Sequence, residues 1–229
     1  MKDSKKAVVL YGPPGSGKGT QAELLVRRSR YIHFDTGAYC EALFYAPGAD
    51  KDPVIRREKR NFETGELVTP SWILKRVSEA TQRIARSGSS IVLSGSPRTM
   101  FEAFGDKRNT GLMKTLASLY GKKSIFIFSI RVPEEVSIMR NSHRSICSVC
   151  KTPAGFLGGK KSNVCMFCGA SLRKRTLDTP DVIRVRIQEY KNRTFPILEE
   201  LRNGKYQIMK INGEPAPYRM FEEIQKRLR

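Results

Sequence analysis

Two groups of residues in this chain have the types and spacing needed to bind phosphate and a metal ion. The first is GPPGSGKGT at residues 12–20, which follows an apolar run and precedes a helical pattern. Gly12, Gly15 and Gly17 let the backbone turn its N–H groups inward, and Lys18 can then reach the β- and γ-phosphates of a nucleotide. A plain turn before a helix would need neither the lysine nor the preceding strand, so the segment predicts a phosphate-binding loop. The other residues of this candidate site are Ser16, Gly19 and Thr20.

The second group consists of four of the five cysteines, which form two C-x-x-C pairs within residues 144–175. Paired cysteines at this spacing suit a tetrahedral Zn²⁺ site, which can hold together a flap too small to bury a core of its own. Gly169 follows the second pair and permits the tight turn of a zinc knuckle. Free thiols, a redox pair and a nucleic-acid-binding zinc module are the alternatives. The candidate ligands are Cys147, Cys150, Cys165 and Cys168.

Further candidate residues come directly after apolar runs that predict strands. Arg98 follows the run at 90–94, and Thr36 follows the run at 31–34. Because parallel strands bring their carboxyl ends to one edge of a sheet, we expect both residues beside the phosphate loop. There Arg98 can clamp a phosphate through two N–H groups, and Thr36 can offer a hydroxyl.

The elements that must position these residues alternate between short apolar runs and longer helical patterns. The apolar runs are continuous, which indicates a parallel sheet covered on both faces. The alternation predicts an α/β fold with right-handed crossovers, into which the cysteine segment is inserted. Strands are expected at 7–11, 31–34, 90–94, 124–130 and 206–211, and helices at 18–29, 53–64, 70–87, 99–120, 133–143, 180–202 and 216–228.

Composition bounds the class of protein. The 229 residues suit one domain with an inserted piece, and 39% apolar residues are enough for a full core. No apolar run approaches the length of a membrane span or the core of a signal peptide, so we expect a cytoplasmic protein. Lys and Arg outnumber Asp and Glu by 42 to 22, which favours nucleotides, RNA or another polyanion as partner. A merely solvated basic surface explains the same charge.

Taken in order, GPPGSGKGTQ, DTG, GELV, SGSPRT and the arginine-flanked cysteine pairs resemble the adenylate kinase family of nucleoside monophosphate kinases. The resemblance covers nearly the whole chain, and the cysteine segment is similar to the zinc-bearing lid of that family. It implies a single P-loop kinase domain over 1–229, with a three-layer fold and a five-stranded parallel sheet. It also implies a monophosphate-binding arm at about 36–70 and a lid at about 144–175. The implied reaction is phosphoryl transfer from Mg·ATP to AMP, giving two ADP, and we expect a monomer.

The resemblance also implies roles for arginines that spacing alone does not single out. Arg140 and Arg144 fall at the ATP side of the lid hinge. Arg175 and Arg186 fall where the lid contacts the transferring phosphates. Together with Lys18 and Arg98, they would neutralise the charge that phosphoryl transfer concentrates. The remaining implied contacts to the monophosphate are Glu66, Leu67, Val68, Gly95, Ser96 and Glu102.

Several residues depart from the pattern of the family. Ser94 and Ala38 stand where the family usually has carboxylates that orient waters around Mg²⁺, and Asp35 is a nearby substitute. Glu41 stands where an arginine usually grips the AMP phosphate. That departure would leave more of the phosphate contact to Arg98.

Glu102 stands where the family usually has a glutamine that recognises the adenine of AMP. A carboxylate only accepts hydrogen bonds, and guanine offers two donors, so the local chemistry favours GMP while the wider resemblance favours AMP. We expect AMP with weakened base discrimination, or a Glu102 that simply turns into solvent. The alternatives are a kinase of another monophosphate, GMP first, and a noncatalytic RNA- or ribosome-associated protein on the same fold. The net charge and the missing carboxylates favour the latter, and the full set of phosphate-binding cations disfavours it.

Overall fold

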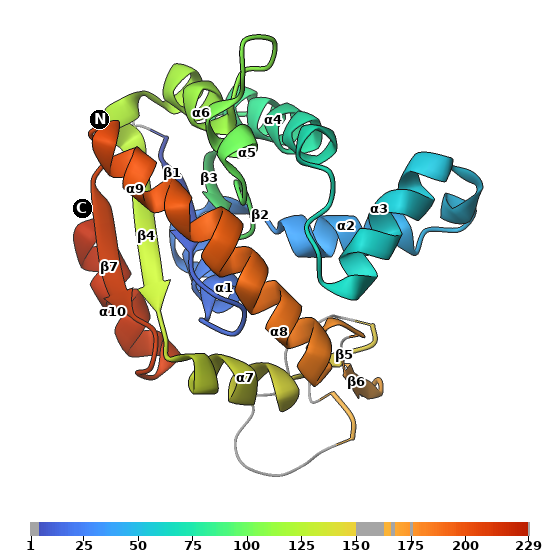
Figure 1. Cartoon of the computed structure of the whole chain (residues 1–229). Helices are drawn as coiled ribbons and strands as arrows, with labels where there is room; N and C mark the ends of the chain where they lie inside the picture. The colour runs from blue at the N-terminus through green and yellow to red at the C-terminus, as the bar shows by residue number, and fades with distance from the viewer. Residues whose placement is uncertain (1–4, 150–162, 166–167, 175, 229) are drawn as a thin grey trace.

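The computed structural model describes residues 5–149, 163–165, 168–174 and 176–228. Within these ranges, five parallel strands form the central sheet in the order β2-β3-β1-β4-β7 (Figure 1). The predicted α/β fold with a five-stranded parallel sheet is confirmed. The strands are β1 (Ala7–Tyr11), β2 (Tyr31–Phe34), β3 (Ser90–Leu93), β4 (Ile125–Arg131) and β7 (Ile208–Asn212).

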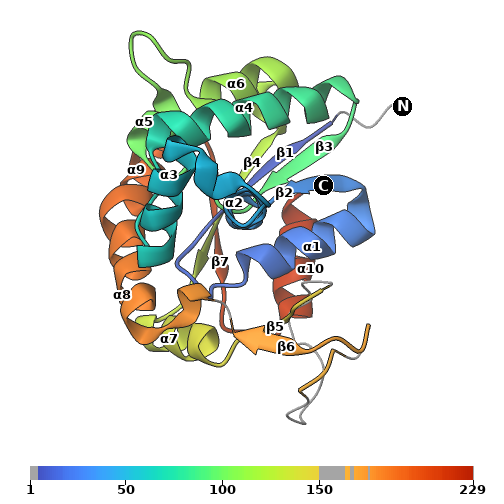
Figure 2. The same cartoon turned by 90° about the vertical axis from the view of Figure 1, so that its right-hand side faces the viewer.

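Helices cover both faces of the sheet and complete three layers (Figure 2). The side chains of β1 alternate between the two apolar cores: Val8 and Leu10 pack with one set of helices, and Val9 and Tyr11 pack with the other. Both faces of the strand are therefore buried, which explains its continuous apolar run. The first set is α1 (Lys18–Ser29) and α10 (Pro217–Arg227); the second includes α4 (Pro70–Arg86), α6 (Leu112–Tyr120) and α9 (Phe195–Asn203).

No helix in the described part of the chain combines the length and the apolar character that a membrane crossing requires.

A continuous helical run covers the predicted helix at 180–202. It consists of α8 (Pro180–Glu189), a π-helical turn over Tyr190–Thr194 and then α9. Pro180 occupies the first turn, where its missing N–H costs nothing. The π-helical turn matters for the site, because Tyr190 and Thr194 both line the cleft described below.

The predicted helix over 99–120 is wrong, because the structure has two helices there. The first is α5 (Met100–Phe104), and the second is α6. Gly105 adopts a φ of +74° and ends α5, after which Asp106 closes a turn by accepting from two backbone N–H groups. At Gly111 a Cβ atom would lie 2.3 Å from a backbone carbon of Phe104, so only glycine fits. The apolar spacing continues across the loop, but the two glycines interrupt the helix.

The helices α2 (Thr36–Phe44) and α3 (Pro53–Thr64) project away from the sheet (Figure 1). The sequence pattern did not predict α2. The buried Glu58 of α3 joins this projection to the start of α4, since its carboxylate accepts hydrogen bonds from the N–H and the hydroxyl of Thr69. These bonds outweigh the effect of burial and hold the pKa of Glu58 below its ordinary value.

The cysteine segment begins and ends on a small antiparallel pair that was not predicted. Its strands are β5 (Ser145–Cys147) and β6 (Leu172–Lys174). Helix α7 (Glu134–Ser142) leads into β5, and β6 leads toward α8. The segment is thus attached to the core through two neighbouring connections.

Candidate active site

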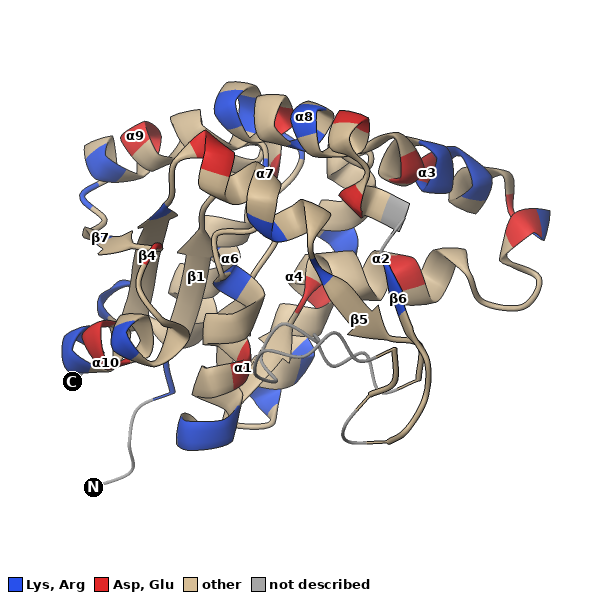
Figure 3. Cartoon of the chain, turned by 90° about the horizontal axis from the view of Figure 1, so that it is seen from below, with Lys and Arg blue, Asp and Glu red and all other residues tan. Residues whose placement is uncertain are grey.

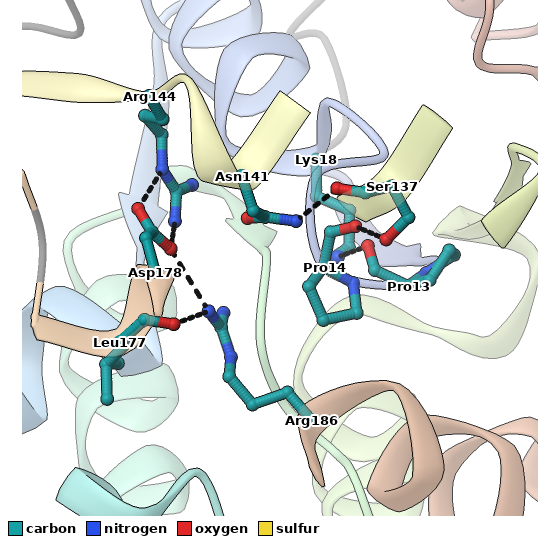
Figure 4. A network of polar contacts seen from close by, with 9 residues as sticks. All are labelled: Pro13, Pro14, Lys18, Ser137, Asn141, Arg144, Leu177, Asp178 and Arg186. Atoms are coloured by element: carbon teal, nitrogen blue, oxygen red, sulfur yellow. Dashed lines mark hydrogen bonds and ion pairs between the residues drawn. The ribbon is translucent and has the colours of Figure 1, made fainter. Parts of the chain in front are cut away.

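The phosphate loop connects β1 to α1 and is fixed against α7. Gly15 has a φ of +74°, and a Cβ atom there would lie 2.6 Å from the side-chain nitrogen of Asn141 and 2.9 Å from the carbonyl oxygen of Ser137. The hydroxyl of Ser137 in turn donates to the carbonyl of Pro14 (Figure 4). The loop therefore packs closely against the helix that leads into the cysteine segment. It contains Gly12, Gly15, Ser16 and Gly17, followed by Lys18, Gly19 and Thr20 in the first turn of α1.

The ammonium group of Lys18 lies within this loop. It donates to the carbonyls of Gly12 at 2.7 Å and Pro13 at 2.8 Å. Burial, together with the nearby guanidinium groups of Arg98 and Arg186, lowers the pKa of Lys18 well below its ordinary value. Three cations therefore face the same space, and a bound anion would stabilise all of them.

Two adjoining cavities lie in this part of the structure, and residues of the loop line the first of them. The first has about 500 Å³ of empty space and the second about 350 Å³, and both are partly open to solvent. Leu67, Gly95, Ser96 and Arg98 line both, so Arg98 stands at their junction. Predicted site residues from both halves of the chain line these cavities. The first is lined by Gly12, Lys18 and Arg186, and the second by Thr36, Glu66, Val68 and Glu102.

Asp178 holds two of the predicted arginines side by side. Its carboxylate accepts from Nε and Nη2 of Arg144 at 2.9 and 2.7 Å, and from Arg186 at 3.5 Å (Figure 4). Arg186 also donates to the carbonyl of Leu177. The side chain of Asp178 is 1% exposed, so this pairing is shielded from water. The N-cap position of α8 belongs to the neighbouring Thr179, so Asp178 is available for this pairing.

Arg140 and Arg175 were predicted to join the same cluster. The guanidinium of Arg140 donates to the carbonyls of Gly213 at 2.7 Å and Glu214 at 3.0 Å, in the loop after β7. It therefore lies against that loop, outside the residues that line the two cavities. Arg175 lies outside the described residues.

Glu41 connects the projecting helices to the cysteine segment. Its carboxylate accepts from the guanidinium of Arg173 in β6 at 3.0 Å. Glu41, where the resemblance implies a phosphate-binding arginine, is thus paired with an arginine of the cysteine segment. The sequence offered no signal for this pair, because α2 and β6 are far apart along the chain.

Asp35 was expected to substitute for the carboxylates missing at Ser94 and Ala38. The structure gives it a different role: Oδ1 accepts from the N–H groups of Gly37 and Ala38 and caps α2. An N-cap aspartate before an unpredicted helix is a signal that the sequence contained.

Glu102 is buried, so the expectation that it turns into solvent is wrong. Its side chain accepts from the N–H of Arg98 and from the hydroxyl of Thr99, both at 3.0 Å, while Thr99 accepts from the N–H of Glu102. This reciprocal pair caps α5. Burial raises the pKa of Glu102, although the bonds from Arg98 and Thr99 act in the opposite direction. Each oxygen still has a lone pair for a ligand in the second cavity.

Three of the four predicted metal ligands come together. The sulfur atoms of Cys147, Cys165 and Cys168 all lie within 4.8 Å of one another, and Cys150 lies outside the described residues. Sulfurs that share a tetrahedral zinc with bonds of ~2.3 Å are about 3.8 Å apart, so the cluster fits such an ion. Gly169 adopts a φ of +71° and donates to the carbonyl of Cys165 at 2.8 Å, forming the predicted tight turn.

Comparison with known proteins gives one consistent family. The family model described as adenylate kinase matches residues 10–205. The adenylate kinase of Methanococcoides burtonii is 33% identical over 224 residues, which cover 96% of this chain and 97% of that protein. The adenylate kinase of Geotalea daltonii is 30% identical over 223 residues, and the alignment covers 96% of each chain.

Proposed function

The chain belongs to the adenylate kinase family of ATP:AMP phosphotransferases, and we propose that ATP and AMP meet in the cleft formed by the two cavities. The observation that carries the proposal is the position of Arg98. It stands where a cavity beside a phosphate loop opens into a second cavity that lacks such a loop. A donor and an acceptor bound in these two cavities would direct their phosphates toward the same guanidinium.

In this arrangement the first cavity receives the polyphosphate of ATP. The inward N–H groups of the loop and Lys18 bind the phosphates, and Arg140 and Arg144 act at the ATP side of the lid hinge. The second cavity receives AMP, with Thr36 and the backbone around Leu67 near the nucleotide. Phosphoryl transfer needs alignment and charge neutralisation more than covalent help from the protein. Lys18, Arg98, Arg144, Arg175 and Arg186 would supply that neutralisation.

Mg²⁺ would accompany ATP and neutralise part of the charge of its phosphates. The chain offers hydroxyl groups for the hydration shell of such an ion, at Thr20 in the first turn of α1 and at Ser94 after β3. Mg²⁺ keeps several waters and takes oxygen partners, so this donor set fits it. Asp35 contributes less, because one carboxylate oxygen caps α2.

We assign residues 144–175 to a lid and residues 36–70 to a monophosphate-binding arm. Zn²⁺ bound by Cys147, Cys150, Cys165 and Cys168 would give the lid a fixed shape without a large core. A closed lid would keep water away from the phosphates, so that ATP is not hydrolysed in place of being donated. The cysteine cluster and the Glu41–Arg173 pair support this assignment.

The proposal is tested by a coupled assay of purified protein with Mg·ATP and AMP, GMP, UMP or CMP. ADP should form fastest with AMP. The variant Lys18→Ala should lose activity with every acceptor, which excludes a contaminating kinase. Faster transfer to GMP than to AMP would contradict the assignment of the second cavity to AMP.

A further inference from the structure

Three polar side chains form a continuous chain from the end of β3 to α1. Nε2 of His33 lies 2.6 Å from the hydroxyl of Ser94, and Nδ1 of His33 lies 2.9 Å from the carboxylate of Glu23. The side chain of His33 is 9% exposed and that of Glu23 is 55% exposed, while Ser94 is 6% exposed. The charged end of the chain is therefore hydrated, and its Ser94 end is buried.

The donors and acceptors in this chain have a defined direction. A carboxylate only accepts, so Nδ1 of His33 carries the proton that is shared with Glu23. In the neutral ring Nε2 is then an acceptor, and the hydroxyl of Ser94 donates to it. Ser94 has one hydroxyl proton, so its oxygen keeps lone pairs for a further partner. Hydrogen bonds in a series polarise one another, which increases the negative character of that oxygen.

The sheet places Ser94 at the end of β3, next to the strand that leads into the phosphate loop. His33 pairs with Val92 in β3, and Val92 packs in the core that includes α1. Ser94 lies two residues further along than Val92 and so shares its face of the sheet. β3 is hydrogen-bonded to β1, the strand that leads into the loop. The hydrogen bonds thus connect Glu23 of α1 with the residue that follows β3.

We propose that Glu23 and His33 are positioning residues that make the Ser94 hydroxyl an acceptor for a water in the hydration shell of nucleotide-bound Mg²⁺. This inference rests on the proposed function of the cleft. A serine hydroxyl alone is a weaker acceptor than a carboxylate, because it carries no charge. The bonds through His33 polarise this hydroxyl and so make it a better acceptor, at a strand end where the sequence has serine in place of a carboxylate.

The first experiment separates cation binding from catalysis. The Kd of a nonhydrolysable ATP analogue is measured by calorimetry with and without Mn²⁺, for the unmodified protein and for Ser94→Ala, His33→Gln and Glu23→Gln. The gain in affinity that Mn²⁺ provides should fall about three- to tenfold in Ser94→Ala and His33→Gln, as for the loss of one hydrogen bond. It should fall less in Glu23→Gln, because that side chain is exposed. The control is Glu222→Gln on the exposed side of α10, which should leave the gain unchanged.

A purely structural role would lower thermal stability and leave the gain from Mn²⁺ unchanged, and this result would overturn the inference. The proposed function is tested separately by whether the unmodified protein forms ADP from Mg·ATP and AMP. The Mn²⁺ measurement does not depend on that reaction. A failure of this inference can therefore be distinguished from a failure of the proposed function.

A second experiment examines the direction of the bonds. Nitrogen NMR of the neutral His33 ring should show a proton on Nδ1 and none on Nε2 in the nucleotide-free protein. A ring protonated only on Nε2 would overturn the inference. Ser94→Asp places a carboxylate directly at the strand end, so adding His33→Gln to it should reduce the gain from Mn²⁺ less than His33→Gln does alone. An equal reduction in both backgrounds would show that His33 does not act through residue 94.

Discussion

Single cations set the chemistry of the cleft. Arg98 stands at the junction of the two cavities, and Asp178 holds Arg144 and Arg186 next to each other. The pKa of Lys18 is lowered by burial and by these arginines. A polyphosphate bound in the cleft would offset the repulsion between Lys18 and these arginines. The effect would be strongest during transfer, when the negative charge of the phosphates is most concentrated.

Arg186→Ala should therefore lower kcat more than it raises KM, by about a factor of 10³, since a comparable arginine contributes mainly to the transition state. The measurement is steady-state kinetics with ATP and AMP varied in turn. Arg184→Ala is the matched control, because Arg184 lies on the same helix, is 68% exposed and pairs with Asp181. A near-normal kcat in Arg186→Ala would exclude it from the transferring phosphates.

Glu102→Gln should sharpen the preference for AMP over GMP. The buried carboxylate offers acceptors only, whereas an amide offers a donor for N1 of adenine and an acceptor for its 6-amino group. A mismatched contact costs about 1–3 kcal/mol, so the AMP:GMP ratio of kcat/KM should rise roughly ten- to a hundredfold. An unchanged ratio would show that residue 102 does not contact the base.

The same substitution should change the dependence of stability on pH. The pKa of Glu102 is raised in the folded protein, so ionisation of this side chain costs free energy of folding above that pKa. Glu102→Gln should thus increase the free energy of unfolding at pH 8. The gain should disappear below the ordinary value of 4.5, where the carboxyl is neutral in both states. Urea unfolding at pH 8 and pH 4 measures the difference, and an equal effect at both would point to the capping bonds alone.

At the scale of elements, the described part of the proposed lid offers little besides the cysteine cluster that could hold its shape. It contributes two strands of three residues each, β5 and β6, and Cys147 and Cys165 are buried. Such a small apolar area cannot offset the entropy of ordering the segment. A metal that bridges both ends of the segment would offset it.

The purified protein should contain one zinc per chain without added metal. Cys165→Ser should lose that zinc and lower the thermal stability of the lid, while the core still folds. Elemental analysis and circular dichroism measure the two effects, and Cys40→Ser, in a buried cysteine of α2, should retain the metal. Four titratable thiols in the pairs, with neither zinc nor iron, would contradict the prediction.

At the scale of the whole molecule, the net charge is +20, and the Lys and Arg residues occur on several elements instead of one (Figure 3). Basic residues occur on α1, α3, α8 and α10, and acidic residues lie among many of them. The pair between Glu41 and Arg173 has a more specific position, because it links α2 to β6, which belong to the proposed arm and lid. Their side chains are 22% and 39% exposed, so the pair is partly screened by water.

Breaking this pair should favour more open conformations of the nucleotide-free protein. A surface ion pair contributes at most about 1 kcal/mol, so Glu41→Ala should change the ratio of closed to open molecules by about fivefold or less. Small-angle X-ray scattering at low salt should show a larger radius of gyration in Glu41→Ala, and added salt should have the same effect on the unmodified protein. Glu199→Ala, on the exposed side of α9, is the control. An unchanged radius in Glu41→Ala would show that the pair does not hold the lid.

The sequence by itself determined the elements whose cause is local. β1, β2, α1 and α3 have the predicted bounds, because continuous apolar runs, a glycine loop and the N1 position of Pro53 act over a few neighbouring residues. The phosphate loop and the spacing of the cysteines were evident for the same reason. The break at Gly105 was missed, although its cause is also local, because the apolar spacing continues across it.

Only the tertiary structure decided which polar side chains meet. Arg144 and Asp178 are 34 positions apart, His33 and Ser94 are 61 apart, and Glu41 and Arg173 are 132 apart. A charged or polar residue has the same local pattern whether it is solvated or paired, since its partner is brought to it by the packing of the sheet and helices. The free energy of such a pair depends on distance and burial, and both are properties of the folded chain.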